Sequence, residues 1–229
     1  LTAAHPEYYR LHGDSGKVVA RATAGNAGKV GIVTGGGSGH LPVFTGYVGA
    51  GLLDACAIGD VFASPSAGQM GGAIRAAASG AGVLRLDGGY GVAGMGYAFK
   101  IAGAAAEEGR DLDGVTAVAQ KAADAWRSIG VALSPCTVPQ SGKPTFEIAE
   151  DEIEMGMGIH GEPGVWRGKL RTADEIAGEM MDRLLADNPV ASGDRVSVLV
   201  NSLGATPPEE LYILYNVVKA RLASVGATI

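Results

Sequence analysis

Apolar runs bounded by glycine-rich segments recur along the first half of the chain. Residues 29–34 and 81–86 are short aliphatic runs that predict buried strands. Glycines follow both runs, at 35–39 and 88–91, so each strand is expected to end in a sharp turn. Residues 93–108 and 112–125 then carry apolar side chains at helical spacing and predict two helices, with a short connection at 109–111. Strand, glycine loop and helix in alternation are typical of an open α/β sheet, whose ligands bind beyond the carboxyl ends of the strands.

The pattern of apolar and turn-forming residues changes near Trp126, where we place a domain boundary. Residues 146–149 predict a short strand, residues 195–201 a clear strand, and residues 209–222 a helix. The acidic run at 150–154 is expected to be a solvated face. The second half therefore also has an α/β pattern.

Small polar residues mark the helix starts. Ser64 is expected to cap a helix whose first residue is Pro65, and residues 206–207 repeat this Thr-Pro or Ser-Pro device. A capping box is predicted over residues 172–175. Ser64 and Ser66 would lie at the positive end of their helix, which could hold a phosphate, although plain capping explains them equally well.

The composition indicates a compact globular protein. Of the 229 residues, 47% are hydrophobic and 18% charged, which is enough to bury one large core or two small ones. We predict two α/β domains, residues 1–125 and 126–229, with open mixed sheets flanked by helices and a substrate site in the crevice near the Gly-rich loops. The 37 glycines lie among apolar runs, so they indicate tight turns and close backbone approaches rather than disorder.

Charge and cysteine content narrow the class of function and the compartment. The net charge is −6 and no Lys/Arg cluster contains interleaved aromatic residues, which argues against nucleic-acid binding. The two cysteines are too few for a disulfide framework, so a cytoplasmic location is expected. No apolar run approaches the ~20 residues that span a bilayer. The chain begins with Leu1 rather than Met, so a preceding segment could carry a signal.

Two segments place one histidine among glycines: His40 follows residues 35–39, and His160 lies within residues 156–164. Glycines let backbone N–H groups converge on a phosphate or an oxyanion, and a histidine beside them can donate, accept or attack. The first segment has neither G-x-G-x-x-G nor P-loop spacing. A structural histidine in a tight turn explains it equally well.

Four separated stretches together resemble the signatures of the dihydroxyacetone kinase family, in its ketose-binding subunit or domain. They are Gly35-Gly36-Gly37-Ser38-Gly39-His40 with Gly46-Tyr47-Val48-Gly49, Gly59-Asp60-Val61-Phe62-Ala63-Ser64-Pro65, Gly158-Ile159-His160-Gly161-Glu162-Pro163-Gly164, and Asn201-Ser202-Leu203-Gly204-Ala205-Thr206 with Glu210-Leu211-Tyr212. The resemblance covers nearly the whole chain.

This resemblance implies phosphoryl transfer to the terminal hydroxyl of dihydroxyacetone or of a related short ketose such as erythrulose. On the matching motif, His160 would bond covalently to the ketone carbon as a hemiaminal, and His40 would help bind and activate the substrate. The remaining pocket residues implied by the family pattern are Gly36, Gly37, Ser38, Ser64 and Ser66.

The family also implies partners. ATP, or a phosphoryl-ADP in a phosphotransferase system, would be bound with Mg²⁺ by a separate subunit or fused domain, so no metal and no nucleotide are expected on this chain. A homodimer is expected as well. The sequence leaves open which donor and which ketose are used.

The chain departs from the family pattern after Tyr90-Gly91. The family carries a general-base aspartate in a Tyr-x-Gly-Asp pattern there, whereas this chain continues with Val92, and Asp87 is not given that role. A family segment is therefore expected to be absent between Gly91 and Val92, either because the sequence contains only ordered residues or through a natural deletion that would remove the base. The same comparison predicts that the chain starts after the family's first helix and stops before its last strands.

Two further interpretations follow. A non-catalytic ketose-binding sensor of the same family could keep His160 and lose the aspartate. Leu41 stands before Pro42 where many dihydroxyacetone enzymes have Glu-Pro, which favours an altered pocket for a ketotetrose. A generic sugar-phosphate isomerase is disfavoured, because neither glycine loop contains a lysine or a carboxylate pair.

Overall fold

The computed structural model describes residues 1–23, 27–87, 93–137 and 142–229. The glycine loop at 88–91 and the expected junction between Gly91 and Val92 lie outside the described residues. The chain forms two compact units, residues 1–126 and 127–229, and each is described by itself.

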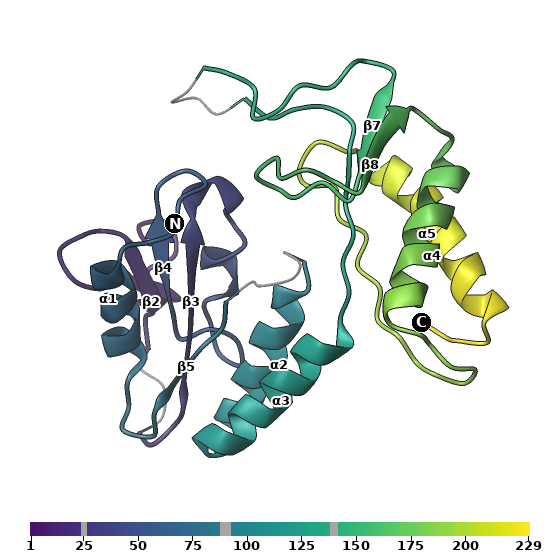
Figure 1. The fold of residues 1–229 in the computed structure, drawn as a ribbon. Helices are drawn as coiled ribbons and strands as arrows, with labels where there is room; N and C mark the ends of the chain where they lie inside the picture. The colour runs from purple at the N-terminus through teal and green to yellow at the C-terminus, as the bar shows by residue number, and fades with distance from the viewer. Residues whose placement is uncertain (24–26, 88–92, 138–141) are drawn as a thin grey trace. The chain divides into compact units, whose positions relative to one another are not determined.

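A five-stranded mixed sheet forms the centre of the first unit (Figure 1). Its strands, in spatial order, are β1 (Tyr9–Leu11), β2 (Val18–Arg21), β4 (Ala55–Gly59), β3 (Gly31–Gly37) and β5 (Val83–Arg85). The β3 strand pairs in parallel with both β4 and β5, and the β1–β2 and β2–β4 pairs are antiparallel. The carboxyl ends of β3, β4 and β5 therefore meet at one edge of the sheet.

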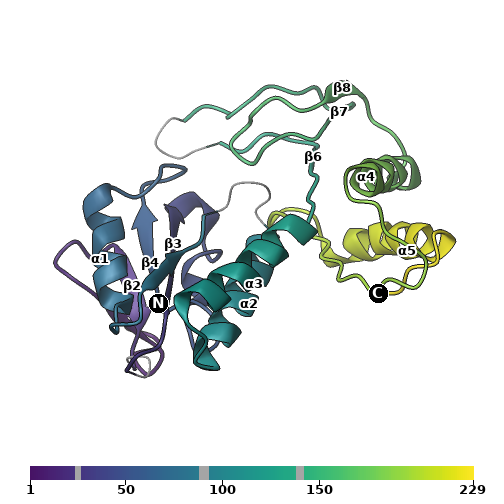
Figure 2. The same ribbon diagram turned by 60° about the horizontal axis from the view of Figure 1, so that its bottom comes forward.

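Helices cover both faces of this sheet (Figures 1 and 2). Helix α1 (Ala67–Ala77) packs on one face, against Val33 and Ala57. The pair α2 (Met95–Glu107) and α3 (Leu112–Ala125) packs on the other, against the neighbouring residues Ile32 and Cys56. Successive side chains of a strand point to opposite faces, so buried runs without polar alternation suit a sheet covered on both sides.

The second unit contains a small antiparallel sheet, β6 (Val131–Ala132), β7 (Glu152–Met155) and β8 (Trp166–Lys169), and two helices, α4 (Ala173–Asp187) and α5 (Pro208–Ser224). Ile153 and Met155 of β7 pack against Ile176 of α4. A second core joins Met181 of α4 to Leu222 of α5. The predicted α/β architecture of open sheets flanked by helices is thus confirmed, with all three strands of this sheet antiparallel.

Two strand predictions in the second unit are wrong, and the solvated face is wrong in part. Residues 146–149 form no strand, and residues 152–154 of the acidic run belong to β7. Residues 195–201 keep the alternation of half-buried and exposed side chains, but only Arg195 forms a bridge, to Thr228. A strand needs a hydrogen-bonded neighbour along its length, and no described strand runs beside this segment.

Two of the predicted helix caps are wrong. Helix α1 is capped by Ser66, not Ser64: the Ser66 hydroxyl accepts from the Gln69 N–H and the Gln69 side chain accepts from the Ser66 N–H, which completes a capping box. Thr206 does not cap α5, whose N-cap residue is Pro207. The capping box predicted over residues 172–175 is confirmed.

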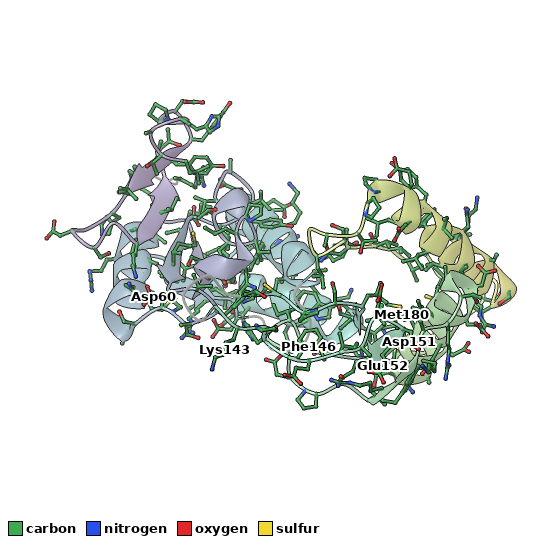
Figure 3. All side chains as sticks on the ribbon, turned by 90° about the horizontal axis from the view of Figure 1, so that it is seen from above. Asp60, Lys143, Phe146, Asp151, Glu152 and Met180 are labelled. Atoms are coloured by element: carbon green, nitrogen blue, oxygen red, sulfur yellow. The ribbon has the colours of Figure 1, made fainter. Side chains whose placement is uncertain are left out.

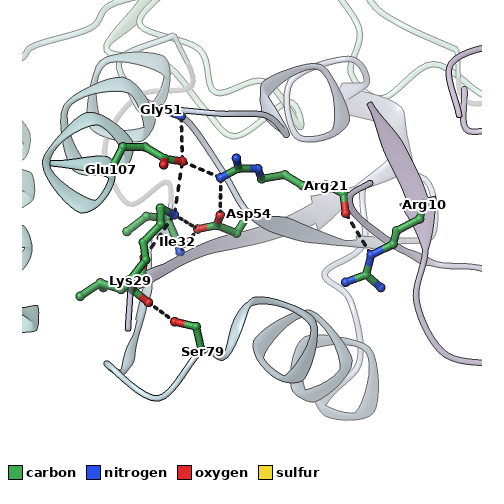
Figure 4. Close-up of polar contacts among 9 residues, drawn as sticks. Arg10, Arg21, Lys29, Ile32, Gly51, Asp54, Ser79 and Glu107 are labelled. Carbon is green, nitrogen blue, oxygen red and sulfur yellow. Dashed lines mark hydrogen bonds and ion pairs between the residues drawn. The ribbon is translucent and has the colours of Figure 1, made fainter. Parts of the chain in front are cut away.

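Charged side chains of the first unit form a connected cluster around Asp54, with Lys29 and Asp54 buried and Arg21 and Glu107 half-buried (Figure 4). The Lys29 ammonium lies 2.6 Å from Asp54 Oδ2, and Arg21 Nη1 lies 3.0 Å from Asp54 Oδ1 and 2.5 Å from Glu107 Oε1. The Ile32 N–H donates to Asp54 Oδ2 at 2.8 Å. These contacts link β2, β3 and α2, so the charges are paired within the protein instead of being solvated.

Candidate functional site

The glycines before His40 continue a strand instead of forming a turn. Gly35, Gly36 and Gly37 belong to β3, opposite Ala57, Ile58 and Gly59 of β4, and the chain turns only at the short helix Ser38–His40. Their positions leave no room for a side chain. A Cβ on Gly36 would overlap the Phe44 ring, and one on Gly37 would lie 2.9 Å from the Asp60 carbonyl oxygen.

These glycines therefore permit close packing, and none of them has the left-handed backbone that an anion-binding nest requires. The Ser38 N–H donates to the Asp60 carbonyl oxygen at 3.1 Å, so this donor is used within the fold. The phosphate nest considered from the sequence is not formed by this stretch.

Two phenyl rings flank His40 at the carboxyl edge of the sheet. The His40 and Phe62 ring centroids are 5.0 Å apart, and the Phe44 ring meets His40 edge-on at 6.3 Å. Phe62 has a left-handed backbone with φ of 54°, which is costly for a bulky residue. A Cβ on Gly39 would lie 2.5 Å from the Phe62 ring, so Gly39 makes room for it. His40 is half-buried beside these two rings.

The segment carrying Ser64 and Ser66 folds over the same edge. A Cβ on Gly59 would lie 2.8 Å from Ser64 C, and Ala63 N donates to the Asp60 carbonyl oxygen at 3.1 Å. Both serines are exposed, and the Ser66 side chain is engaged in capping α1. The structure thus brings together the predicted residues of the first unit: Gly36, Gly37, Ser38, His40, Ser64 and Ser66.

His160 belongs to the second unit, on a tight loop between β7 and β8. Its imidazole Nδ1 lies 3.0 Å from Glu162 Oε1, and its backbone N–H donates to Glu162 Oε2 at 3.0 Å. The Gly161 N–H donates to the Gly158 carbonyl oxygen at 3.0 Å, and Gly161 has a φ of 89°. The His160 side chain is 43% exposed, so solvent reaches the ring.

Glu154 anchors the far end of this loop, and sequence reasoning missed it. Its buried carboxylate accepts from the Gly164 N–H at 2.6 Å and from Arg167 Nε at 2.7 Å. The Gly164 N–H, followed by Arg167, keeps the pKa of Glu154 below its ordinary value, although burial opposes this. The signal in the sequence was its place between Ile153 and Met155, which are both apolar.

A neighbouring loop also lies against the His160 loop. A Cβ on Gly161 would lie 3.3 Å from the Thr145 carbonyl oxygen and 3.4 Å from the Phe146 ring. The side chains of Phe146 in this neighbouring loop and of Asp151 and Glu152 in the acidic run can be followed in Figure 3. Glu150 and Asp151 of that run are exposed and Glu152 is half-buried, whereas Glu154 is buried.

No group of three His, Cys, Asp or Glu side chains that could hold a metal is found within the described residues. No helix in the described part of the chain is both long and apolar enough to cross a membrane. A cavity of about 270 Å³ lies between β5, α2 and α3, and none of the predicted site residues lines it.

Residues 1–90 and 85–229 match the family model of the Dak1 domain. The chain belongs to the Dak1 domain family. The resemblance to dihydroxyacetone kinases is therefore confirmed.

The curated relatives of this chain include dihydroxyacetone-binding subunits and erythrulose kinases. The chain is 39% identical to the "PTS-dependent dihydroxyacetone kinase 1, dihydroxyacetone-binding subunit DhaK" of Listeria innocua, over 93% of this chain and 77% of that protein. It is also 39% identical to the "D-erythrulose kinase" of Mycolicibacterium smegmatis, over 92% of this chain but only 44% of that longer protein. The alignment with the Listeria subunit spans 255 positions, more than the 229 residues present here, so that relative carries residues this Dak1 domain lacks.

Solved structures show the same fold. A "dihydroxyacetone kinase operon co-activator" superposes with a TM-score of 0.90 at 28% identity, covering 99% of this chain and 82% of that one. The dihydroxyacetone kinase from C. freundii, in complex with AMP-PNP and Mg²⁺, superposes with a TM-score of 0.86 at 32% identity, covering 96% of this Dak1 domain and 48% of that chain. An enzyme and a gene regulator therefore share this architecture.

Proposed function

We propose that this chain binds a short ketose covalently through His160 and presents its terminal hydroxyl for phosphoryl transfer. The observation that carries the proposal is the partly exposed His160 imidazole, fixed to a carboxylate on a glycine-rich loop, in a chain that belongs to the Dak1 family. A neutral imidazole is a competent nucleophile near neutral pH. Its addition to a ketone carbon would exclude glycerol-like polyols, which have no carbonyl group.

In this proposal His40 is the second histidine that acts on the ketose. His40, held between the Phe44 and Phe62 rings, would hydrogen-bond to the ketose and activate it. Gly36, Gly37 and Ser38 would form the wall beside it, and Ser64 with Ser66 the rim. Covalent capture at His160 would fix a small, flexible substrate for reaction.

The phosphoryl donor would come from a partner. The described residues contain no acidic cluster for Mg²⁺, so no step of the proposal is assigned to a metal on this chain. The C. freundii enzyme crystallised with AMP-PNP and Mg²⁺ is about twice as long as the region matched here, which leaves room for a nucleotide-binding domain. We propose a separate subunit or fused domain for ATP, or for phosphoryl-ADP, and a homodimer of this chain.

A second candidate function is a non-catalytic ketose sensor. It is favoured by the co-activator structure, which superposes over 99% of this chain. It is also favoured by the Tyr90-Gly91-Val92 sequence, which lacks the aspartate of the family's Tyr-x-Gly-Asp pattern. Both functions share the covalent step at His160 and differ only in phosphoryl transfer.

The ketose itself is either dihydroxyacetone or a ketotetrose. The chain is equally identical, at 39%, to a dihydroxyacetone-binding subunit and to an erythrulose kinase. Leu41, which is 45% exposed beside His40, favours erythrulose because an apolar side chain replaces the acidic residue expected there.

Carbon NMR with [2-¹³C]dihydroxyacetone tests the covalent step. The ketone signal should move to the region of a tetrahedral carbon on wild-type protein and remain unchanged on His160→Ala. Equal spectra would overturn the proposal. Phosphorylation of both ketoses, with and without a nucleotide-binding partner subunit, then separates the kinase from the sensor. Turnover with the partner supports the kinase, and binding without turnover supports the sensor.

A further inference from the structure

The geometry points to Glu162 as a positioning residue that selects the reactive tautomer of His160. This inference rests on the proposed function for its chemical meaning. The two oxygens of one carboxylate hold the residue at two points: Oε1 lies 3.0 Å from the His160 ring Nδ1, and Oε2 accepts from the His160 backbone N–H at 3.0 Å. The ring is thus fixed relative to its own main chain.

The tautomer follows from the chemistry of this contact. An ionised carboxylate can only accept, so it favours the imidazole with its proton on Nδ1. The nucleophilic lone pair of this tautomer resides on Nε2. Glu162 remains ionised well below neutral pH, since its own backbone N–H and then the His160 donors keep its pKa below the ordinary value despite partial burial.

The loop is built to admit this carboxylate. A Cβ on Gly158 would overlap the Glu162 carboxyl group, so only glycine leaves the space. The Gly158 N–H donates to the Glu162 carbonyl oxygen at 3.1 Å, and the left-handed Gly161 lets the chain return within four residues. Glu154 holds the other end of the loop through the Gly164 N–H. Gly158 therefore leaves the space, and Gly161 adopts the backbone conformation, that the His160–Glu162 contact requires.

The contact between Glu162 and the His160 ring also stabilises the positive charge that forms on the ring during addition. When Nε2 bonds to the ketone carbon, the C=O π electrons move to oxygen and the imidazole becomes a cation that still carries the Nδ1 proton. The alkoxide takes one proton from solvent, and the Nδ1 proton stays on the ring. The adduct is therefore a cationic hemiaminal, formed with the net uptake of one proton. A carboxylate facing Nδ1 stabilises this cation.

Long-range ¹H–¹⁵N NMR of the ligand-free protein tests the tautomer without any ketose. The chain has four histidines, and His160→Ala assigns the relevant signals. We expect the Nδ1–H form to predominate in wild type, and the Nε2–H form to become the major one in Glu162→Ala. Identical tautomer populations in the two proteins would overturn the inference.

The [2-¹³C]dihydroxyacetone adduct is then measured on the same proteins. Its equilibrium constant should fall at least about tenfold in Glu162→Ala, as when histidine ligands lose their carboxylate partners, and recover partly in Glu162→Asp. Gly158→Ala, which displaces the carboxylate without removing it, should resemble Glu162→Ala. A wild-type Nδ1–H tautomer without any adduct would refute the proposed function and leave the role of Glu162 supported. Unchanged adduct formation in Glu162→Ala would refute that role alone.

Discussion

The Lys29 ammonium and the Asp54 carboxylate lie 2.6 Å apart, and both side chains are almost fully buried. Removing one partner of such a pair leaves the other charge desolvated and unpaired. We expect Asp54→Ala to lower the free energy of unfolding by about 3–5 kcal/mol, measured by urea denaturation.

Asp151→Ala is the matched control, because Asp151 pairs with Lys169 at the surface. Exposed pairs contribute little, so its denaturation curve should stay close to that of wild type. Equal losses in Asp54→Ala and Asp151→Ala would contradict a stabilising role for the buried cluster.

Acid should weaken the same cluster through Glu107. Burial alone would raise the pKa of Glu107, but hydrogen bonds from Arg21 and the Gly51 N–H, with the Lys29 ammonium nearby, lower it below the ordinary value. Its contribution to stability is therefore complete above the ordinary carboxyl pKa and is lost as the pH falls through the lower folded value. Thermal melting of Glu107→Gln should show a flatter pH dependence in this acid range, with the two proteins converging below it. Parallel curves would exclude Glu107 as the titrating group.

Gly36→Ala should disturb the packing of the Phe44 ring beside His40 and lower the stability of the protein. The new Cβ would overlap the buried Phe44 ring, so either the ring or β3 must move. We expect a loss of about 1–3 kcal/mol in unfolding free energy, typical of overpacking. Gly49→Ala is the control, since its Cβ would meet nothing within 4 Å. Adding Phe44→Leu to Gly36→Ala should restore part of the stability, and no recovery would argue against this clash.

Glu154→Gln should loosen the His160 loop. The amide keeps the volume of the side chain but loses the charge that strengthens its bonds with the Gly164 N–H and Arg167. Amide hydrogen exchange at residues 158–165 should become faster, and the free energy of unfolding should fall by about 1–2 kcal/mol. Glu152→Gln, on the same strand but more exposed, should leave exchange in that loop unchanged. Faster exchange in both variants would indicate a general effect of charge.

The two serines before α1 should differ in their effect on stability. Ser66→Ala removes the capping box and should cost about 1 kcal/mol. Ser64→Ala should leave the melting temperature unchanged, because Ser64 does not cap the helix. The opposite order of the two effects would restore the cap expected from the sequence.

Local patterns alone predicted much of this protein. The helix at 112–125 and the capping box at Thr172 depend on spacing within one or two turns, so the sequence specified them fully. The α/β class followed from alternating strands and helices, and the four separated motifs identified the family. His40 and His160 were selected as site candidates because two of these motifs place a single histidine among glycines.

Tertiary contacts decided the rest. Gly35–Gly37 extend β3 because β4 runs alongside, which no local turn signal reports. Glu154 is buried because Arg167 and Gly164, more than nine residues away, neutralise and bind it. The segment 195–201 has the right alternation but no described strand beside it to complete its hydrogen bonds. Propensity and periodicity act between near neighbours in the chain, whereas pairing, burial and charge compensation depend on which distant segments meet.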